Sequence, residues 1–134
     1  MRTQSMHERP RPEALIGRLQ EDDRLDVVAE QADRMSGLLG DGDTYAVMRG
    51  DWLGHALHPA MTDLPIGFWT SAAVLDLVGG RSARPAAQRL IALGLLSVPF
   101  TALTGLADYR SVPDRAAMRV GAVHAAANTV AAVL

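Results

Sequence analysis

The sequence predicts an all-α fold: a helical integral membrane protein with about three hydrophobic helices in an up-down-up bundle, preceded by a soluble or interfacial N-terminal helical tail. The first observation is a division of the chain, because all but three of its 15 acidic residues lie in residues 1–63. The second is that residues 64–134 contain three long apolar stretches. The third is that the middle stretch, residues 90–107, contains no charged side chain, so it lacks the polar face of a soluble helix.

Residues 1–50 are the predicted tail, and their apolar residues indicate a helix. Five of these residues are spaced by three or four positions, which places them on one helical face. Gly40 and Gly42 follow and are expected to end the helix. We expect this helix to lie on the rest of the protein or on the membrane surface. The five residues are Leu25, Val28, Ala32, Met35 and Leu39.

Residues 51–134 are the predicted membrane domain, with helices at about 63–80, 86–107 and 115–134. A helix that crosses the hydrocarbon layer of a bilayer needs roughly 20 apolar residues, within a range of about 17–25. The second helix meets this length alone, whereas the first needs its flanking residues. Three polar side chains interrupt the third helix: Arg119, His124 and Asn128.

Prolines and small polar residues predict local features of the first two membrane helices. Pro99 lies inside the second helix, where it leaves one carbonyl without its usual donor. We expect Ser97 or Thr101 to bond that carbonyl. Asp63 precedes the first apolar run and is expected to cap the first helix at its N-terminus.

An up-down-up arrangement brings the start of the first helix, the end of the second and the start of the third to one membrane edge. This shared edge collects nearly all of the reactive side chains of the second half of the chain. At the other edge, Asp76 is expected to pair with Arg81 or Arg89. The residues of the shared edge are His55, His58, Asp63, Asp108, Tyr109, Arg110, Asp114, Arg115, Arg119 and His124.

The composition excludes several classes of function. The 13 basic residues are all arginine and the formal net charge is -2, which argues against nucleic acid as a partner. The chain has no cysteine, so disulfides, thiolate zinc sites, cysteine-ligated iron–sulfur clusters and cysteine nucleophiles are excluded within it. It has no nucleophile elbow, phosphate loop or zinc-protease motif, so it is not expected to be an enzyme on its own. The N-terminus lacks an apolar segment, so no cleavable signal peptide is expected.

Three blocks of sequence, in order along the chain, resemble a known family. They are "WLGHALHPAMTDLPIGFWTSAAVLDLVGG" from Trp52, "GLLSVPFTALTGLADY" from Gly94 and "RVGAVHAAAN" from Arg119. Together they resemble the bacterial predicted membrane proteins that carry domain of unknown function 2231, in particular an actinobacterial branch. The family's first block reads Gly-His-Pro-Leu-His-Pro, and here only its first proline is changed, to Ala56.

The resemblance implies a multi-pass protein of the cell membrane with four helices. Some members of the family are fused to, or followed by, a Rieske-type iron–sulfur domain. This implies redox work, with a Rieske-type or other redox protein as partner. The present chain accounts for three of the four helices and ends at Leu134. We therefore expect a fragment, a truncated relative that lacks the last helix, or a protein whose remaining part lies elsewhere.

The histidines of the shared edge support two hypotheses. In the first, the protein is a haem- or metal-binding subunit in membrane electron transfer. Haem b would take its axial ligands from histidine rings on different helices, and arginines would bind its propionates. Zinc would instead be bound by the histidines together with aspartate carboxylates. In the second, the protein is a non-redox structural or assembly module whose histidines only bond helix ends. The haem candidates are His55, His58, His124, Arg110 and Arg119, and the metal candidates are His55, His58, His124, Asp63 and Asp108.

Overall fold

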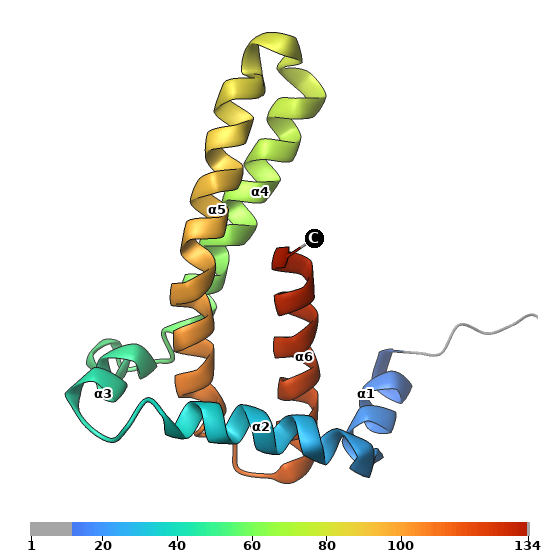
Figure 1. The fold of residues 1–134 in the computed structure, drawn as a ribbon, viewed down its shortest axis with the longest axis vertical. Helices are drawn as coiled ribbons and strands as arrows, with labels where there is room; N and C mark the ends of the chain where they lie inside the picture. The colour runs from blue at the N-terminus through green and yellow to red at the C-terminus, as the bar shows by residue number, and fades with distance from the viewer. Residues whose placement is uncertain (1–11, 134) are drawn as a thin grey trace, which may run out of the picture.

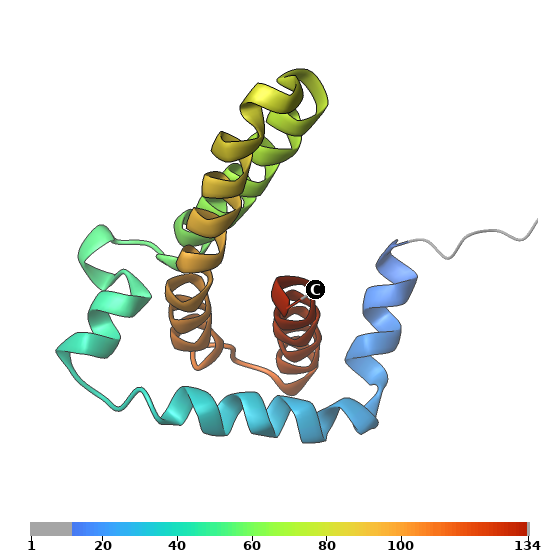
Figure 2. The ribbon, with the colours of Figure 1, turned by 45° about the horizontal axis from the view of Figure 1, so that its top comes forward.

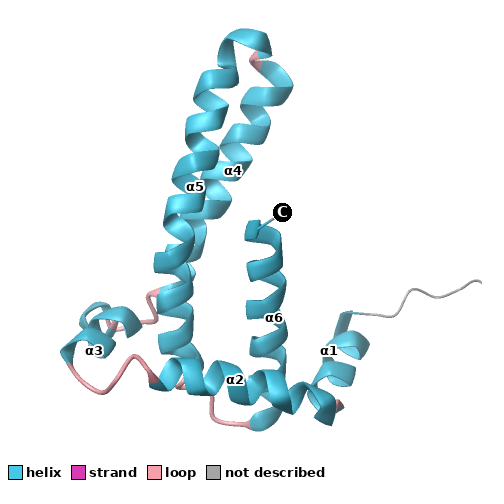
Figure 3. Ribbon diagram, in the orientation of Figure 1, coloured by secondary structure: helices cyan, strands magenta, loops and turns pink. Residues whose placement is uncertain are grey.

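The computed structural model describes residues 12–133, and in that range the chain consists of helices and short loops (Figures 1 and 3). The prediction of an all-α fold is therefore confirmed. Two short 3-10 turns, η1 (Asp23–Leu25) and η2 (Asp51–Leu53), follow the first and third helices. The helices of this range are α1 (Pro12–Glu21), α2 (Asp26–Gly37), α3 (Asp43–Arg49), α4 (His58–Val78), α5 (Gly80–Tyr109) and α6 (Arg115–Val133).

The two longest helices, α4 and α5, form an antiparallel hairpin and pack against each other (Figure 1). Glycines of α5 make room for rings from α4, because Trp69 lies against Gly94 and His58 lies against Gly105. A side chain on either glycine would overlap the ring. Small residues at such positions let helices approach closely in a membrane, where water does not drive them together.

Both helices of the hairpin are longer than the sequence predicts. α4 begins at His58 rather than near residue 63, and α5 runs from Gly80 to Tyr109 rather than from 86 to 107. Asp63 therefore lies inside α4, and the prediction that it caps the helix is wrong. The helix starts earlier because Pro59 occupies its first turn, where proline's fixed φ suits the helix and its missing N–H costs nothing.

The last helix, α6, runs in the same direction as α4 but stands apart from the hairpin (Figures 1 and 2). Its contacts are mainly with α1 and α2. α2 lies across the ends of α5 and α6, and α1 lies beside the base of α6 (Figure 1). Within residues 12–133, α6 is therefore joined to the hairpin largely through the tail, and the three long helices do not pack into a closed bundle.

The buried face of α2 differs from the predicted one. Ala29 and Ser36 are buried, whereas Val28 and Met35 are 41% and 47% exposed. The reason is steric, because small residues let α2 lie close across the ends of α5 and α6. The other three predicted residues are at least partly buried, as expected: Leu25, Ala32 and Leu39.

The hairpin carries its small residues inside and its large apolar residues outside. Ala72 and Ala87 are each 2% exposed, whereas Leu96 and Phe100 are 67% and 61% exposed. α5 has a mean hydropathy of 2.0 over its most apolar 18 residues, yet only 22% of that stretch is buried. Between residues 12 and 133 it is the one helix whose length and composition alone indicate that it could cross a membrane. This distribution is expected where lipid, rather than water, surrounds a helix.

Candidate functional site

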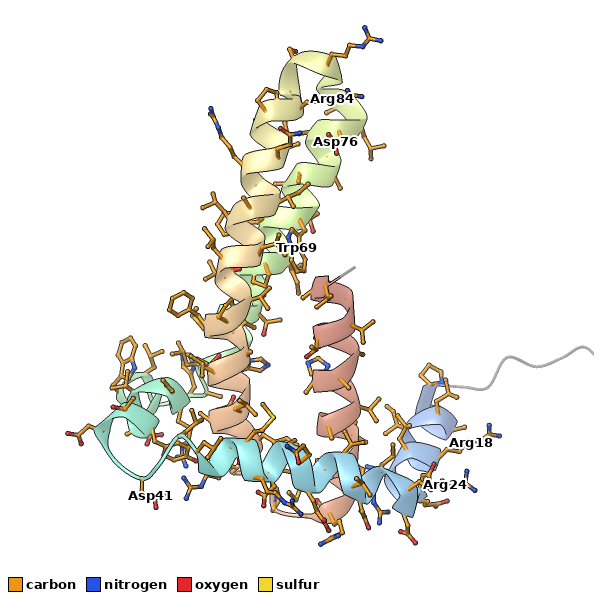
Figure 4. The ribbon with its side chains drawn as sticks, viewed as in Figure 1. Arg18, Arg24, Asp41, Trp69, Asp76 and Arg84 are labelled. Atoms are coloured by element: carbon orange, nitrogen blue, oxygen red, sulfur yellow. The ribbon has the colours of Figure 1, made fainter. Side chains whose placement is uncertain are left out.

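The side chains singled out by the sequence come mainly from one end of the molecule. This is the end where α3, the start of α4, the end of α5 and the base of α6 lie, and α2 crosses it (Figure 1). Arg24 of the tail and Asp41 also lie at this end, whereas Asp76 and Arg84 lie at the far end of the hairpin (Figure 4). The charged side chains labelled in Figure 4 thus lie toward the two ends of a largely apolar hairpin.

At the far end, the predicted ion pair of Asp76 is wrong. None of the ion pairs among the described residues joins Asp76 to Arg81 or Arg89. Asp76 instead shares an open pocket with Arg81 and Arg84. Charged groups in such an open place are solvated by water, so little is gained from holding them in one paired geometry.

His58 joins the two helices of the hairpin. Its Nδ1 lies 3.0 Å from the carbonyl oxygen of Thr101 and 3.4 Å from Oγ1 of Thr104. Because a carbonyl oxygen can only accept, Nδ1 carries the hydrogen and donates it to Thr101. In the neutral ring this bond fixes the tautomer that has its lone pair on Nε2, which is the form in which a histidine can ligate a metal.

Hydroxyl groups extend this connection along the hairpin. Thr101 Oγ1 donates across to the carbonyl of Met61 at 2.9 Å and lies 3.1 Å from the carbonyl of Ser97 in its own helix. Ser97 Oγ donates to the carbonyl of Gly94 at 2.6 Å. The prediction that one of these hydroxyls bonds the carbonyl freed by Pro99 is therefore wrong. That carbonyl belongs to Leu95, and serine or threonine in a helix reaches back three or four residues, which misses it from either position.

His55 lies apart from His58, in the loop before α4. It is exposed, and its Nδ1 donates to the carbonyl of Ala56 at 3.0 Å. The ring lines an open pocket of about 540 Å³, together with Arg49 and Asp108. Within this pocket the Arg49 charge is already balanced by Asp51, which raises the pKa of Arg49 above its usual value.

His124 lies on the exposed part of α6. Its Nε2 accepts a hydrogen bond from the side-chain amide of Asn128 at 3.0 Å, and the same amide donates to the His124 carbonyl at 2.9 Å. These bonds stay within one helix. Among the described residues, His124 is therefore not tied to either of the other candidate histidines.

The five residues named for a metal do not assemble into one site. Residues 12–133 contain no group of three histidine, aspartate or glutamate side chains close enough to hold a metal ion. Asp63 is exposed on α4, and Asp108 faces the pocket beside His55. A structural zinc site needs four ligands around one point, which this arrangement does not supply.

Arg119 binds the tail rather than an open site. The side chain belongs to a residue that is only 9% exposed, and it bonds both carboxylate oxygens of Asp26, at 2.7 and 3.1 Å. It also donates to Asp23 at 2.5 Å and to the carbonyl of Gln20 at 2.7 Å. The hydrogen bond from Arg119 holds the pKa of Asp26 below its usual value. Arg119 thus fastens the first turns of α6 to the tail.

Arg110 is similarly engaged at the end of α5. It forms an ion pair with Asp41 at 2.6 Å and donates to the carbonyl of Gly40 at 2.9 Å. Its guanidinium also lies over the ring of Tyr45, 5.1 Å from the ring centroid. The two arginines proposed for haem propionates therefore both bind carboxylates of the chain itself.

Tyr109 has a structural role that sequence patterning does not predict. Its hydroxyl lies 3.1 Å from the carbonyl of Ala29 and 3.0 Å from that of Met118, so it links α5, α2 and α6. The ring packs against Gly121, which leaves space for it. The signal available in the sequence was charge complementarity, because the acid-rich tail precedes an arginine-rich edge. That pattern indicates ion pairs such as those of Arg119 with Asp23 and Asp26, although it does not identify Tyr109.

Comparison with known proteins gives one informative result. No curated protein and no solved structure matches the chain. Residues 54–134, which include the whole hairpin and α6, match the family described as predicted membrane protein DUF2231. The match covers more than half of the sequence and supports a membrane location. The chain belongs to the DUF2231 family of predicted membrane proteins.

Proposed function

We propose that the protein is a non-redox assembly module of the cell membrane. In this proposal α4, α5 and α6 each cross the bilayer, and α1 to α3 lie at one membrane surface. The observation that carries it is the outer surface of α5, which is strongly apolar and largely unburied. Lipid solvates such a surface, whereas in water it would favour aggregation. The proposal thereby divides the chain into a tail, residues 1–50, and a membrane domain, residues 51–134.

The engagement of the candidate ligands supports a structural role. His58 connects α4 to α5, Arg110 connects the end of α5 to the loop before α3, and Arg119 connects α6 to the tail. Each of these polar groups is paired with another part of the chain, so it positions helices. α6 is largely exposed from His124 to Val133, and in this proposal that part assembles with another membrane helix.

A haem-bearing electron-transfer subunit is the second candidate, and one observation favours it. His58 donates through Nδ1 to a backbone carbonyl, which leaves Nε2 available as an axial ligand. His124 on α6 is the candidate for the second axial position. Haem would supply one-electron chemistry to a redox partner, while this chain would position the group and shield it from water.

An absorption spectrum separates the two candidates. The protein is expressed with added haem, purified in mild detergent and measured both oxidised and dithionite-reduced, with a metal analysis of the same sample. The assembly module predicts no Soret band, no α-band and no bound metal. Bands that disappear in His58→Asn would contradict it, because asparagine can still donate to Thr101 but lacks the imidazole ligand. His124→Ala serves as the matching test of the second ligand.

A further inference from the structure

We propose that α3 and η2 form an interfacial anchor, the shoulder, defined as residues 43–53. In this proposal the shoulder inserts its apolar side chains into the bilayer at the level of the lipid headgroups and the first acyl carbons. The proposal rests on the proposed membrane crossing of α5. It adds a lipid-binding surface to a segment that lies outside the matched family region and inside the polar half of the sequence.

The shoulder exposes an apolar patch that includes a tryptophan. Trp52 is 66% exposed, Val47 is 55% exposed and Leu53 is 38% exposed. The indole N–H of Trp52 donates to the carbonyl of Val47 at 3.3 Å, so its polar atom is already satisfied within the shoulder. The ring therefore presents an apolar surface without an unpaired donor, which suits the boundary between lipid headgroups and acyl chains.

Three hydrogen bonds hold the shoulder at the base of the hairpin, two of them at the end of α5. Tyr45 Oη donates to the carbonyl of Ala107 at 3.3 Å, and the Arg49 guanidinium donates to Ser111 Oγ at 3.4 Å. The N–H of Leu57, just before α4, donates to the carbonyl of Arg49 at 3.1 Å. The shoulder is thereby held beside the last turn of α5, which ends at Tyr109. A membrane-crossing α5 leaves the hydrocarbon layer at this level, where tryptophan is enriched in membrane proteins.

The size and charge of the patch favour lipid over a protein partner. A stable protein interface buries about 800 Å² on each partner, and three side chains supply far less. The patch of Val47, Trp52 and Leu53 carries no charge itself. The nearby Arg49 is paired with Asp51 at 2.9 Å, and the other charge of the shoulder, Asp43, lies in the first turn of α3. The neighbouring α5 also exposes large apolar side chains, with Phe100 61% and Leu103 36% exposed.

Tryptophan fluorescence tests this proposal, because the chain has two tryptophans in different places. Trp69→Phe leaves Trp52 as the only tryptophan, and Trp52→Phe leaves Trp69, which lies midway along α4 against Gly94. Each full-length variant is reconstituted into phosphatidylcholine vesicles that carry bromine either near the headgroup or near the chain end. Aqueous acrylamide is the second quencher.

We expect Trp52 to be quenched most by the shallow bromine and to be shielded several-fold from acrylamide relative to the same variant in denaturant. Trp69 should be quenched most by the deep bromine. Strong acrylamide quenching of Trp52 without bromine quenching, while Trp69 still responds to deep bromine, overturns the shoulder alone. If neither tryptophan responds to bromine, both the shoulder and the proposed membrane crossing are overturned.

A pair of charge substitutions provides the matched control. Val47→Glu places a carboxylate within the patch, whereas Thr44→Glu places one at another exposed position of α3. Both are made in the Trp69→Phe background. Val47→Glu should weaken quenching of Trp52 by shallow bromine, and Thr44→Glu should leave it unchanged. Equal quenching in the two variants would contradict insertion of this face.

Discussion

The hairpin and α6 are held in place by different kinds of interaction. α4 and α5 are joined by neutral hydrogen bonds, such as that from His58 to Thr101, and by rings packed on glycines, such as Trp69 on Gly94. α6 is joined to the rest of the chain mainly at its base, where Arg119 bonds the carboxylates of the tail. Beyond its first turns it is largely exposed.

This difference follows from the surroundings of each contact. Inside a bilayer an unpaired charge is costly, so helices there associate through close packing and hydrogen bonds between neutral groups. At the membrane edge water is available, and an arginine can pair with carboxylates without the full cost of leaving water. The comparison predicts that packing changes disturb the hairpin, whereas charge changes disturb α6 and the tail.

The largest expected effect comes from Gly94→Val. A side chain at this position overlaps Trp69, so the two helices must separate, and overpacking of this kind lowers the free energy of unfolding by about 3 kcal/mol. Gly67→Val is the control, because no atom lies within 4 Å of a Cβ built there. Its effect should be below about 1 kcal/mol. Unfolding of both variants in detergent, followed by circular dichroism, gives the comparison, and equal losses would argue against the close packing.

Arg119→Gln should detach the tail while leaving the hairpin folded. It removes the charge that holds Asp23 and Asp26, and protease cleavage within α1 and α2 should accelerate by about tenfold or more. Arg115→Gln is the control, because the Arg115 side chain is 62% exposed and its ion pairs are longer, at 3.4 and 3.6 Å. Exposed pairs of that kind contribute little. Rapid cleavage in both variants, or in neither, would contradict the role given to Arg119.

Acid, like Arg119→Gln, should detach the tail from α6. The pKa of Asp26 is lower in the folded protein than in the unfolded chain, where it is about 3.9. Its contribution is therefore fully present above about pH 5 and is lost as the pH falls through the folded pKa, below about pH 4. Because the chain has no cysteine, spin labels at Gln31→Cys and Ala127→Cys report the distance between tail and α6.

The expected result is a broad, longer distance between those labels at pH 3 and a short, narrow one at pH 7. Labels at Ser71→Cys and Leu93→Cys on the hairpin should keep their distance at both values, because no carboxylate takes part in the hydrogen bonds given above between α4 and α5. Parallel changes in both pairs would indicate general unfolding and contradict the difference between the two regions.

The smallest expected effect is that of His58→Ala. Loss of one hydrogen bond between the helices should lower the free energy of unfolding by about 1 kcal/mol. His58→Asn keeps a donor near the position of Nδ1 and should recover part of that loss. Chemical unfolding in mixed detergent measures both variants. An asparagine variant that is less stable than the alanine variant would contradict a hydrogen-bonding role for this ring.

Sequence patterning predicted the helices well because apolar length and helical spacing are local properties. The all-α class and the second hydrophobic helix followed directly from the uncharged run around Leu96. The start of α4 was misplaced because the apolar run begins only after Asp63, whereas the helix already begins at His58 with Pro59 in its first turn. The buried face of α2 was predicted wrongly because neither Ala29 nor Ser36 is a large hydrophobic residue. Small residues are needed there only because α2 crosses the ends of α5 and α6.

The candidate site was less predictable because it depends on the tail. Counting helices brought His58, Arg110 and Arg119 to one edge but could not show that the two arginines bind Asp41, Asp23 and Asp26. These contacts join residues about 70 or more positions apart in sequence. The roles of His55 and His124 as ligands, and of a Rieske-type partner, stay predictions.

Single-cysteine labelling tests the membrane crossing of the hairpin most directly. Ser82→Cys lies just after the turn between α4 and α5, and Gln31→Cys lies on the exposed side of α2, at the opposite end of the hairpin. A membrane-impermeant maleimide is added to spheroplasts before and after permeabilisation. We predict that one of the two positions reacts in intact spheroplasts and that the other reacts only after permeabilisation. Equal reaction of both positions before permeabilisation, or of both only after it, would contradict a hairpin that crosses the bilayer.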